Sequence, residues 1–244
     1  MLYNDRFPRS VRYDQAWALD HSMGPNVLWL AEWLAEGMSL KPGMRVLDLG
    51  CGKALSSIFL AKEFDLEVWA TDLWIGATEN LGRITEAGAE RVYPVHADAH
   101  SLPFADGFFD AAVSLDAYHY FGTDDLYIER FSRLVKTGGQ LGIVSPGTQY
   151  ELDGDVPAHL QPYWVWDFCS FHSPAWWKQH WEKSGQVDVQ CADFLADGWR
   201  HWQAWQELRI SAGLTDDQAE ADMLRIDAGR TLGFTRIVAE KSRS

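Results

Sequence analysis

The chain has 244 residues, and 47% of them are hydrophobic, so it can build one α/β domain with a full core, or one such domain with a small lid. Its formal net charge of −14 disfavours nucleic acid as a partner, because nucleic-acid binding usually requires a basic surface. There is no run of 18 apolar residues and no apolar N-terminal signal segment, so we expect a cytoplasmic protein without a membrane partner.

Polar and aromatic residues dominate positions 1–25, among them Tyr13, Trp17 and His21. Gly24-Pro25 predicts the start of a helix, with the proline near its first position. The apolar residues that share one face of this helix are Val27, Leu30, Ala31 and Leu34. The turn sequence Lys41-Pro42-Gly43 follows the helix.

Strands and helices then alternate along the chain. The predicted strands are 45–50, 67–72, 92–97, 108–116 and 140–145, and the predicted helices between the first three are 53–64 and 75–87. Thr123 is predicted to cap a further helix, with Asp124 and Asp125 in its first turn. Such alternation predicts a doubly wound, mostly parallel sheet.

The C-terminal third continues with strong helix-start signals. Ser173-Pro174 predicts an N-cap and a first helical position, and Thr215–Gln218 reads as a capping box. The predicted elements here are strand 187–193, helix 198–212 and a final strand, 234–240.

Aromatic residues concentrate in one region, since eight of the thirteen tryptophans lie between residues 164 and 205. Their helical spacing favours packing for most of these rings. Two or three of them could instead wall a pocket, because aromatic faces attract cations by ~0.5–2 kcal/mol per contact. An amine or a flat heteroaromatic acceptor would suit such a wall equally well.

Chemistry-bearing residues gather where three successive strands end. Residues 46–52 read VLDLGCG, and the next two strands end near Asp72 and Asp98. Glycines let the backbone approach a ligand closely, and the following helix offers free N–H groups. A carboxylate at the end of the second strand can accept hydrogen bonds from both hydroxyls of a ribose. The pattern therefore predicts a nucleoside-bearing cofactor across the strand ends.

Two other nucleotide sites fit this loop poorly. The dinucleotide fingerprint G-x-G-x-x-G lacks its third glycine, because Leu55 stands there, and no Gly-Lys-Ser/Thr of an ATP loop occurs. Asp48 would repel a phosphate, but it suits the cationic amino group of a methionine. A nicotinamide oxidoreductase is thus disfavoured.

These motifs resemble those of class I S-adenosylmethionine-dependent methyltransferases. The matching segments, in the family's order, are 48–52, Asp72, 97–99, 102–110 and 138–141. The Leu-Pro-Phe…Phe-Asp pattern is most similar to the small-molecule branch, which includes quinone-biosynthesis enzymes. One departure is Ala54, at the position of a common third glycine.

The resemblance implies a Rossmann-like, seven-stranded sheet with an antiparallel last strand, an N-terminal helical lid and an aromatic-rich helical insertion. The implied organisation is a single domain over 1–244. Its parts are a lid and helix (1–40), a cofactor-binding core (41–147), a substrate-side insertion with helices (148–233) and the last strand with its tail (234–244).

The resemblance also implies residue roles toward S-adenosylmethionine. Asp48, Gly50 and Gly52 would hold the methionine end, and Asp72 would take the ribose hydroxyls. The residues expected around the adenine and along the rest of the cofactor are Leu73, Asp98, Ala99 and, through its backbone, Leu115.

His119, which follows the fourth strand, is the first candidate for a catalytic base, because its ordinary pKa suits proton transfer at neutral pH. It could equally cap the following helix or bind a carbonyl. The candidates for contact with the acceptor are Tyr13, Trp17, His21, Tyr118, Tyr120 and His172.

The predicted function is methyl transfer to a small-molecule acceptor by in-line displacement, which requires alignment and the exclusion of water. The alternatives are carbon-centred transfer on a lipid, such as cyclopropanation, and a non-catalytic scaffold that binds the cofactor. No metal is predicted, because the three cysteines are widely spaced and His96 and His100 do not form a helical H-E-x-x-H. The sequence does not indicate the oligomeric state.

Overall fold

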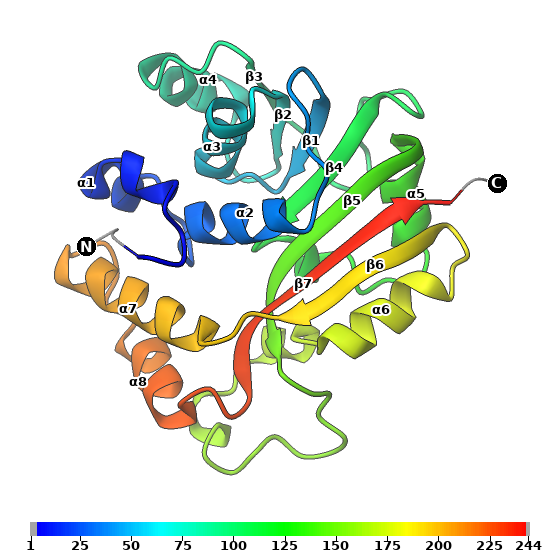
Figure 1. Ribbon diagram of the computed structural model, residues 1–244. Helices are drawn as coiled ribbons and strands as arrows, with labels where there is room; N and C mark the ends of the chain where they lie inside the picture. The colour runs from blue at the N-terminus through cyan, green and yellow to red at the C-terminus, as the bar shows by residue number, and fades with distance from the viewer. Residues whose placement is uncertain (1–3, 243–244) are drawn as a thin grey trace.

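The computed structural model describes residues 4–242, which form one seven-stranded sheet with helices on both faces (Figure 1). The strands are β1 (Arg45–Leu49), β2 (Glu67–Asp72), β3 (Val92–His96), β4 (Phe109–Leu115), β5 (Val135–Thr148), β6 (Val187–Phe194) and β7 (Leu232–Lys241). Their order in the sheet is β3-β2-β1-β4-β5-β7-β6. The five strands β3, β2, β1, β4 and β5 pair in parallel in that order. Strand β7 runs antiparallel to both β5 and β6. The predicted fold class and the antiparallel last strand are confirmed.

The helices follow the predicted order with shifted ends. They are α1 (Gln15–Asp20), α2 (Val27–Glu36), α3 (Leu55–Phe64), α4 (Ala77–Glu86), α5 (Tyr127–Arg133), α6 (Pro174–Glu182), α7 (Gly198–Ser211) and α8 (Gln218–Asp227). Short 3₁₀ turns include η2 (Tyr118–Tyr120) and η4 (Trp166–Ser170). Strand β5 is longer than predicted because its second half pairs with β7 beyond the parallel part of the sheet.

Three predicted helix starts are wrong, and two of them were displaced by a better cap nearby. Helix α2 begins after Asn26, whose side chain accepts a hydrogen bond from Leu28 N, so Pro25 lies outside the helix. Helix α5 begins only at Tyr127, and Thr123 does not cap it. Asp217 caps α8 by accepting from Glu220 N, so the Thr215–Gln218 capping box does not form. The Ser173-Pro174 start of α6 is confirmed.

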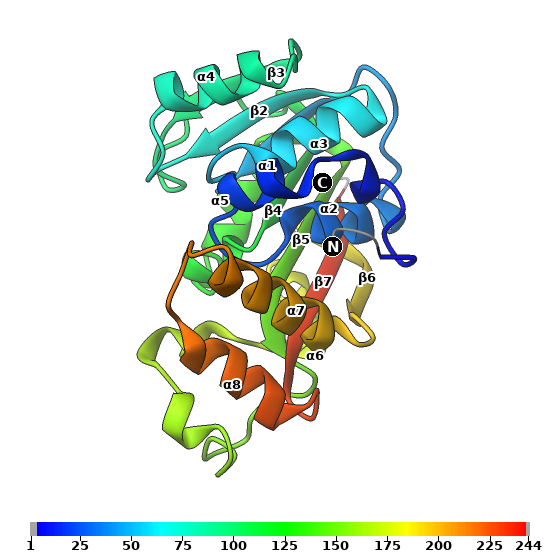
Figure 2. The ribbon, with the colours of Figure 1, turned by 90° about the vertical axis from the view of Figure 1, so that its left-hand side faces the viewer.

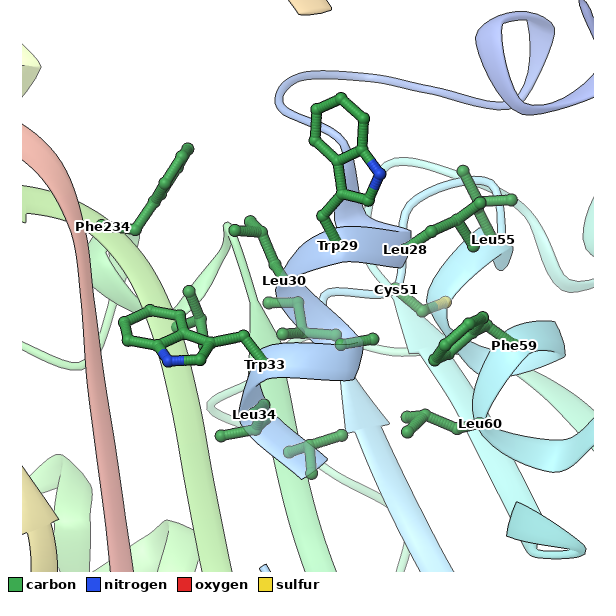
Figure 3. Packing of buried hydrophobic residues seen from close by; sticks show 14 of the residues in the cluster. Leu28, Trp29, Leu30, Trp33, Leu34, Cys51, Leu55, Phe59, Leu60 and Phe234 are labelled. Atoms are coloured by element: carbon green, nitrogen blue, oxygen red, sulfur yellow. The ribbon is translucent and has the colours of Figure 1, made fainter. Parts of the chain in front are cut away.

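One apolar core lies on each face of the sheet. The first core joins α2, α3, α7 and β7, and Figure 3 shows α2 between Phe234 of β7 and Leu55 and Phe59 of α3. The second core joins α5 and α6 to the opposite face, around Phe131 and Trp181. Most of the aromatic-rich region therefore packs, as its helical spacing indicates.

The N-terminal segment and α7 are joined close to the ends of the strands. The indole of Trp205 donates a hydrogen bond from Nε1 to the carbonyl oxygen of Gly24 at 3.2 Å. Figure 2 shows α7 below the N-terminal helices α1 and α2, with α8 packed against the far side of α7. Residues 181 positions apart thus form one wall. Within residues 4–242, none of the helices combines the length and hydrophobicity that crossing a bilayer requires.

Trp177 offers a test of the second core, because its side chain is completely buried and its Nε1 has no hydrogen-bond partner within residues 4–242. Trp177→Ala should lower the free energy of unfolding by about 3–5 kcal/mol, as large-to-small core substitutions do. Trp177→Phe removes the unpaired N–H, so it should cost clearly less. Chemical denaturation of both variants checks this, and equal losses would contradict the assignment of the effect to lost packing.

Candidate cofactor and acceptor site

A cavity of about 350 Å³ opens at the C-terminal ends of the parallel strands. It lies where the chain order reverses between β1 and β4, the place where open α/β sheets bind their ligands. Its wall comes from the N-terminal segment and from the loops after β1, β2, β3 and β4. The lining residues that the sequence predicted are Gly50, Gly52, Asp72, Leu73, Asp98, Ala99, Leu115, His21 and Tyr120.

Close backbone approach explains the glycines of the first loop. Gly50 and Gly52 have φ of +77° and +52°, which an L side chain rarely adopts. A methyl group on Gly50 would also overlap the Cβ of Ala117, and one on Gly52 would lie 2.8 Å from Met23 Sδ. Ala54 takes the left-handed conformation too, with φ of 63°, just before α3. The loop after β1 can therefore approach Ala117 in the loop after β4 this closely only because residue 50 is a glycine.

Asp48 is completely buried and lies beneath the cavity, outside its lining. Its Oδ2 accepts hydrogen bonds from the hydroxyls of Ser56 and Ser57, both at 2.6 Å. Burial raises the pKa of Asp48 to about 6, although the two hydroxyls oppose the shift. In this structure the carboxylate fixes the first turn of α3, and its contact with a methionine amine stays a prediction.

Asp72 reaches the cavity from the end of β2, and backbone N–H groups hold its carboxylate in place. Oδ2 accepts from Gly52 N at 2.8 Å, and Oδ1 accepts from Trp74 N and Ile75 N. A carboxylate has about four acceptor sites, so it can still accept from a ligand. The first two strand ends are thus tied together by the residue expected to bind the ribose.

The far side of the cavity, after β3, carries the predicted adenine residues. Asp98 Oδ1 accepts a hydrogen bond from His100 N at 2.8 Å, and this bond and the His100 ring lower the pKa of Asp98. Ala99 and the exposed Leu73 complete this side. Their contact with an adenine ring stays a prediction.

The structure does not bring all predicted acceptor contacts into the cavity. Those outside its lining are Tyr13, Trp17, Tyr118, His119 and His172. Tyr13 stacks on Trp17, and Tyr118 is buried in the core beside Trp177. His172 stacks on Trp176 at 3.5 Å between ring centroids. In this structure these residues pack against their neighbours.

His119 is 3% exposed, and its ring packs on Tyr120 and Phe171. Burial lowers its pKa to about 4, so the ring is neutral at neutral pH. Because η2 is a tight turn, His119 points inward while Tyr120, the next residue, lines the cavity. The structure gives His119 no direct path to the acceptor, and its role as a base stays a prediction.

Sequence reasoning missed Asp116, which directly follows β4 and lines the cavity. Its backbone is left-handed, with φ of 56°, and its N–H donates to Val144 O at 2.8 Å. Its carboxylate contacts Gly24, where any Cβ would overlap Oδ2. Burial and the nearby charge of Glu220 raise the pKa of Asp116 to about 8, while Arg209 opposes the shift. In the sequence, Asp116 could have been recognised only as an aspartate at the end of a predicted strand.

The raised pKa of Asp116 predicts a pH dependence of stability. The folded state holds this proton up to about pH 8, whereas an unfolded aspartate loses it near 4. The free energy of unfolding should therefore fall as pH rises from about 4 to about 8 on account of this group. His119, buried neutral, acts in the opposite direction only between about 4 and 6.5.

Between pH 6.5 and 8.5 the effect of Asp116 on stability can be measured apart from those of Asp48 and His119, because the pKa values of these two groups lie below that range. The melting temperature of the native chain should fall across it, and that of Asp116→Asn should fall clearly less. An equal decline in both proteins would contradict the assignment.

The central part of the chain is similar to known proteins. Residues 46–139 match the family described as "Methyltransferase domain". A 2-methyl-6-phytyl-1,4-hydroquinone methyltransferase from Synechocystis sp. is 30% identical over 159 residues, which is 62% of this chain and 49% of that protein. The chain thus spans about half the length of this relative.

Two solved structures share the fold over most of the chain. One is a phosphoethanolamine N-methyltransferase 2 from Haemonchus contortus, solved with S-adenosyl-L-methionine. It gives a TM-score of 0.73 at 20% identity, and the match covers 92% of this chain and 55% of that enzyme's chain. The (4+2)-cyclase SpnF gives a TM-score of 0.71 at 20% identity, and the match covers 92% of this chain and 85% of the cyclase. At this identity the likeness shows the fold alone.

The glycine loop, Asp72 and Asp98 meet at one cavity, and all three lie inside the matched segment. The prediction of S-adenosylmethionine as cofactor agrees with this match to a methyltransferase domain. Residues 46–139 therefore match a methyltransferase domain, and this match agrees with the predicted resemblance to class I S-adenosylmethionine-dependent methyltransferases of the small-molecule branch.

Proposed function

We propose that this protein transfers a methyl group from S-adenosylmethionine to a small-molecule acceptor. The observation that carries the proposal is the cavity at the switch point of the sheet, where the loops after four parallel strands converge. When bound, the cofactor supplies a methyl group on a positively charged sulfur. The tasks of the protein are then to orient both reactants and to exclude water.

The cofactor-binding roles follow the order of the strands. Asp98 and Ala99 after β3 bind the adenine, and Asp72 after β2 accepts from the ribose hydroxyls. The loop after β1, with Gly50 and Gly52, takes the methionine end. The loop after β4 comes next across the sheet, so the acceptor binds beside it.

The acceptor side is small and partly aromatic, which supports an amine or a flat heteroaromatic compound. Tyr120 and Trp74 stand at its edge with ring centroids 5.8 Å apart, and Phe121 lines it. We propose that residues 41–147 bind the cofactor, while 1–40 and 148–233 shape the acceptor side of one domain. The cytoplasmic location stays a prediction from the sequence.

Isothermal titration with S-adenosylhomocysteine, the cofactor product, tests the binding step. A thermal-shift comparison with NAD is the control, and only S-adenosylhomocysteine should raise the melting temperature. A shift with NAD alone would overturn the proposal. A panel of small amines and heteroaromatics, followed by release of S-adenosylhomocysteine, then tests transfer. Binding of the cofactor without turnover on any compound would favour the scaffold alternative.

A further inference from the structure

We propose that Asp116 is the substrate-binding residue for a cationic nitrogen, so that the acceptor is an amine and not a neutral ring. This inference rests on the proposed function, and it narrows the acceptor class. Asp116 lines the cavity directly after β4, on the side next to the predicted methionine end. Its carboxylate has no hydrogen-bond donor within residues 4–242, although the surrounding wall holds it closely.

The wall fixes the position of this carboxylate without neutralising it. Asp116 N is bound to Val144 O, and the side chain rests on the backbone of Gly24. Gly24 is in turn held by the indole of Trp205 on α7. A carboxyl group that is fixed in a ligand cavity and lacks a donor is arranged for a cationic partner from outside the chain, because such a partner would offset the cost of ionising it there.

The charged groups around Asp116 leave room for one more cation. Glu220 of α8 raises its pKa, and Arg209 of α7 lowers it. Glu220 already accepts a hydrogen bond from Trp202 Nε1, and Arg209 donates to Gln206. Two carboxyl groups therefore face one guanidinium, and a bound cation would stabilise the ionised form of Asp116.

The cationic and titratable groups that line the cavity have other partners, since Lys53 Nζ donates to Asp20 O and the His100 ring is paired with Asp98. Tyr120 lines the cavity, and burial and the nearby carboxylates of Asp116, Asp167 and Glu220 raise its pKa to about 12. His21 of the N-terminal segment lines the cavity too, and its Nδ1 is engaged with Trp17 O. The aromatic faces of Tyr120 and Phe121 add cation–π attraction, worth ~0.5–2 kcal/mol per contact.

The same carboxylate can prepare a primary or secondary amine for attack. An ammonium donates its proton to the ionised Asp116, which leaves a neutral amine with a free lone pair and a neutral carboxyl group. The raised pKa of Asp116 brings the carboxylate closer in basicity to an amine than an ordinary aspartate is, so this proton transfer costs less here than it would at an unperturbed aspartate. An amine acceptor is thus both recognised and deprotonated by one group.

The test uses two probes of equal shape on the full chain saturated with S-adenosylhomocysteine. Benzyltrimethylammonium carries a permanent charge, and neopentylbenzene is its neutral counterpart. The dissociation constant of the cation should fall about tenfold from pH 7 to pH 9, because the ionised fraction of Asp116 rises from roughly one tenth to nine tenths. Binding of the neutral probe should not change with pH.

Three variants test whether the pH dependence of cation binding comes from Asp116. Asp116→Asn keeps the shape and tolerates the left-handed backbone, and it should remove the pH dependence of cation binding. Asp197→Asn is the matched control, because Asp197 also has a positive φ but lies outside the cavity lining, and it should behave like the native chain. Glu220→Gln should move the midpoint of the pH dependence downward, since a neighbouring like charge is removed.

The outcomes separate the two proposals. If S-adenosylhomocysteine binds but cation binding is absent, independent of pH or unchanged in Asp116→Asn, then this inference is wrong and the proposed function stands. If S-adenosylhomocysteine fails to bind, the proposed function fails and this inference with it. Should Asp116→Asn not fold, the midpoint shift in Glu220→Gln decides, and an unmoved midpoint overturns the inference.

Discussion

Asp72→Ala should abolish useful cofactor binding, lowering the affinity for S-adenosylhomocysteine by at least about 100-fold. The reason is the loss of two charge-assisted hydrogen bonds to the ribose, each worth roughly 1.5–3 kcal/mol. The same carboxylate also holds the Gly52 and Trp74 amides, so part of the loss comes from a loosened cavity wall. Isothermal titration of the native chain and the variant measures the effect.

Asp72→Asn separates ribose binding from support of the loop. The amide oxygen can still accept from Trp74 N and Ile75 N, so the thermal stability should stay near that of the native chain. Ribose binding should still weaken, because the side chain loses its charge and one acceptor oxygen. Unchanged affinity in Asp72→Ala would remove Asp72 from the site and with it the cofactor-binding scheme.

Gly50→Ala should both destabilise the protein and block the cofactor. The positive φ of residue 50 costs an L residue about 1–2 kcal/mol. Overlap of the new methyl group with Ala117 adds roughly 1–3 kcal/mol, because it forces the loops after β1 and β4 apart. Denaturant unfolding and titration with S-adenosylhomocysteine should both show the loss.

Gly43→Ala is the matched control, since Gly43 has φ of +79° but nothing lies within 4 Å of an added Cβ. It should show the conformational cost alone and keep cofactor binding. In the double variant Gly50→Ala/Ala117→Gly the overlap is removed, so stability should recover in part. A double variant no more stable than Gly50→Ala would contradict the close approach of these loops.

Much of the fold and the cofactor side of the cavity could be predicted, because they depend on local signals. Buried strands that end in glycine or aspartate place their last residues at one edge of a parallel sheet, and Gly50, Asp72 and Asp98 do line one cavity. The positive φ at Gly50 and Gly52 agrees with the reason that glycines were expected there.

The acceptor side could not be predicted, because it depends on tertiary contacts. Gly24 and Met23 reach the cavity only through packing against α7, which lies far away in the sequence. Within η2, the sequence does not reveal which side chain points inward: Tyr120 lines the cavity as predicted, whereas His119 lies outside its lining. The missed helix starts arose where several capping residues competed within a few positions.

The hydrogen bond between Trp205 and Gly24 has a consequence for evolution and for engineering. The predicted cofactor side of the cavity is built from residues 49–121, whereas the opposite side comes from residues 21–27, which Trp205 of α7 holds through Gly24. Mutations can therefore accumulate in the outer segments and change which compound is accepted, while the adenosyl end is inherited intact. Chimaeras that exchange only the N-terminal segment or only α7 should lose the contact between Trp205 and Gly24, so both segments must be exchanged together.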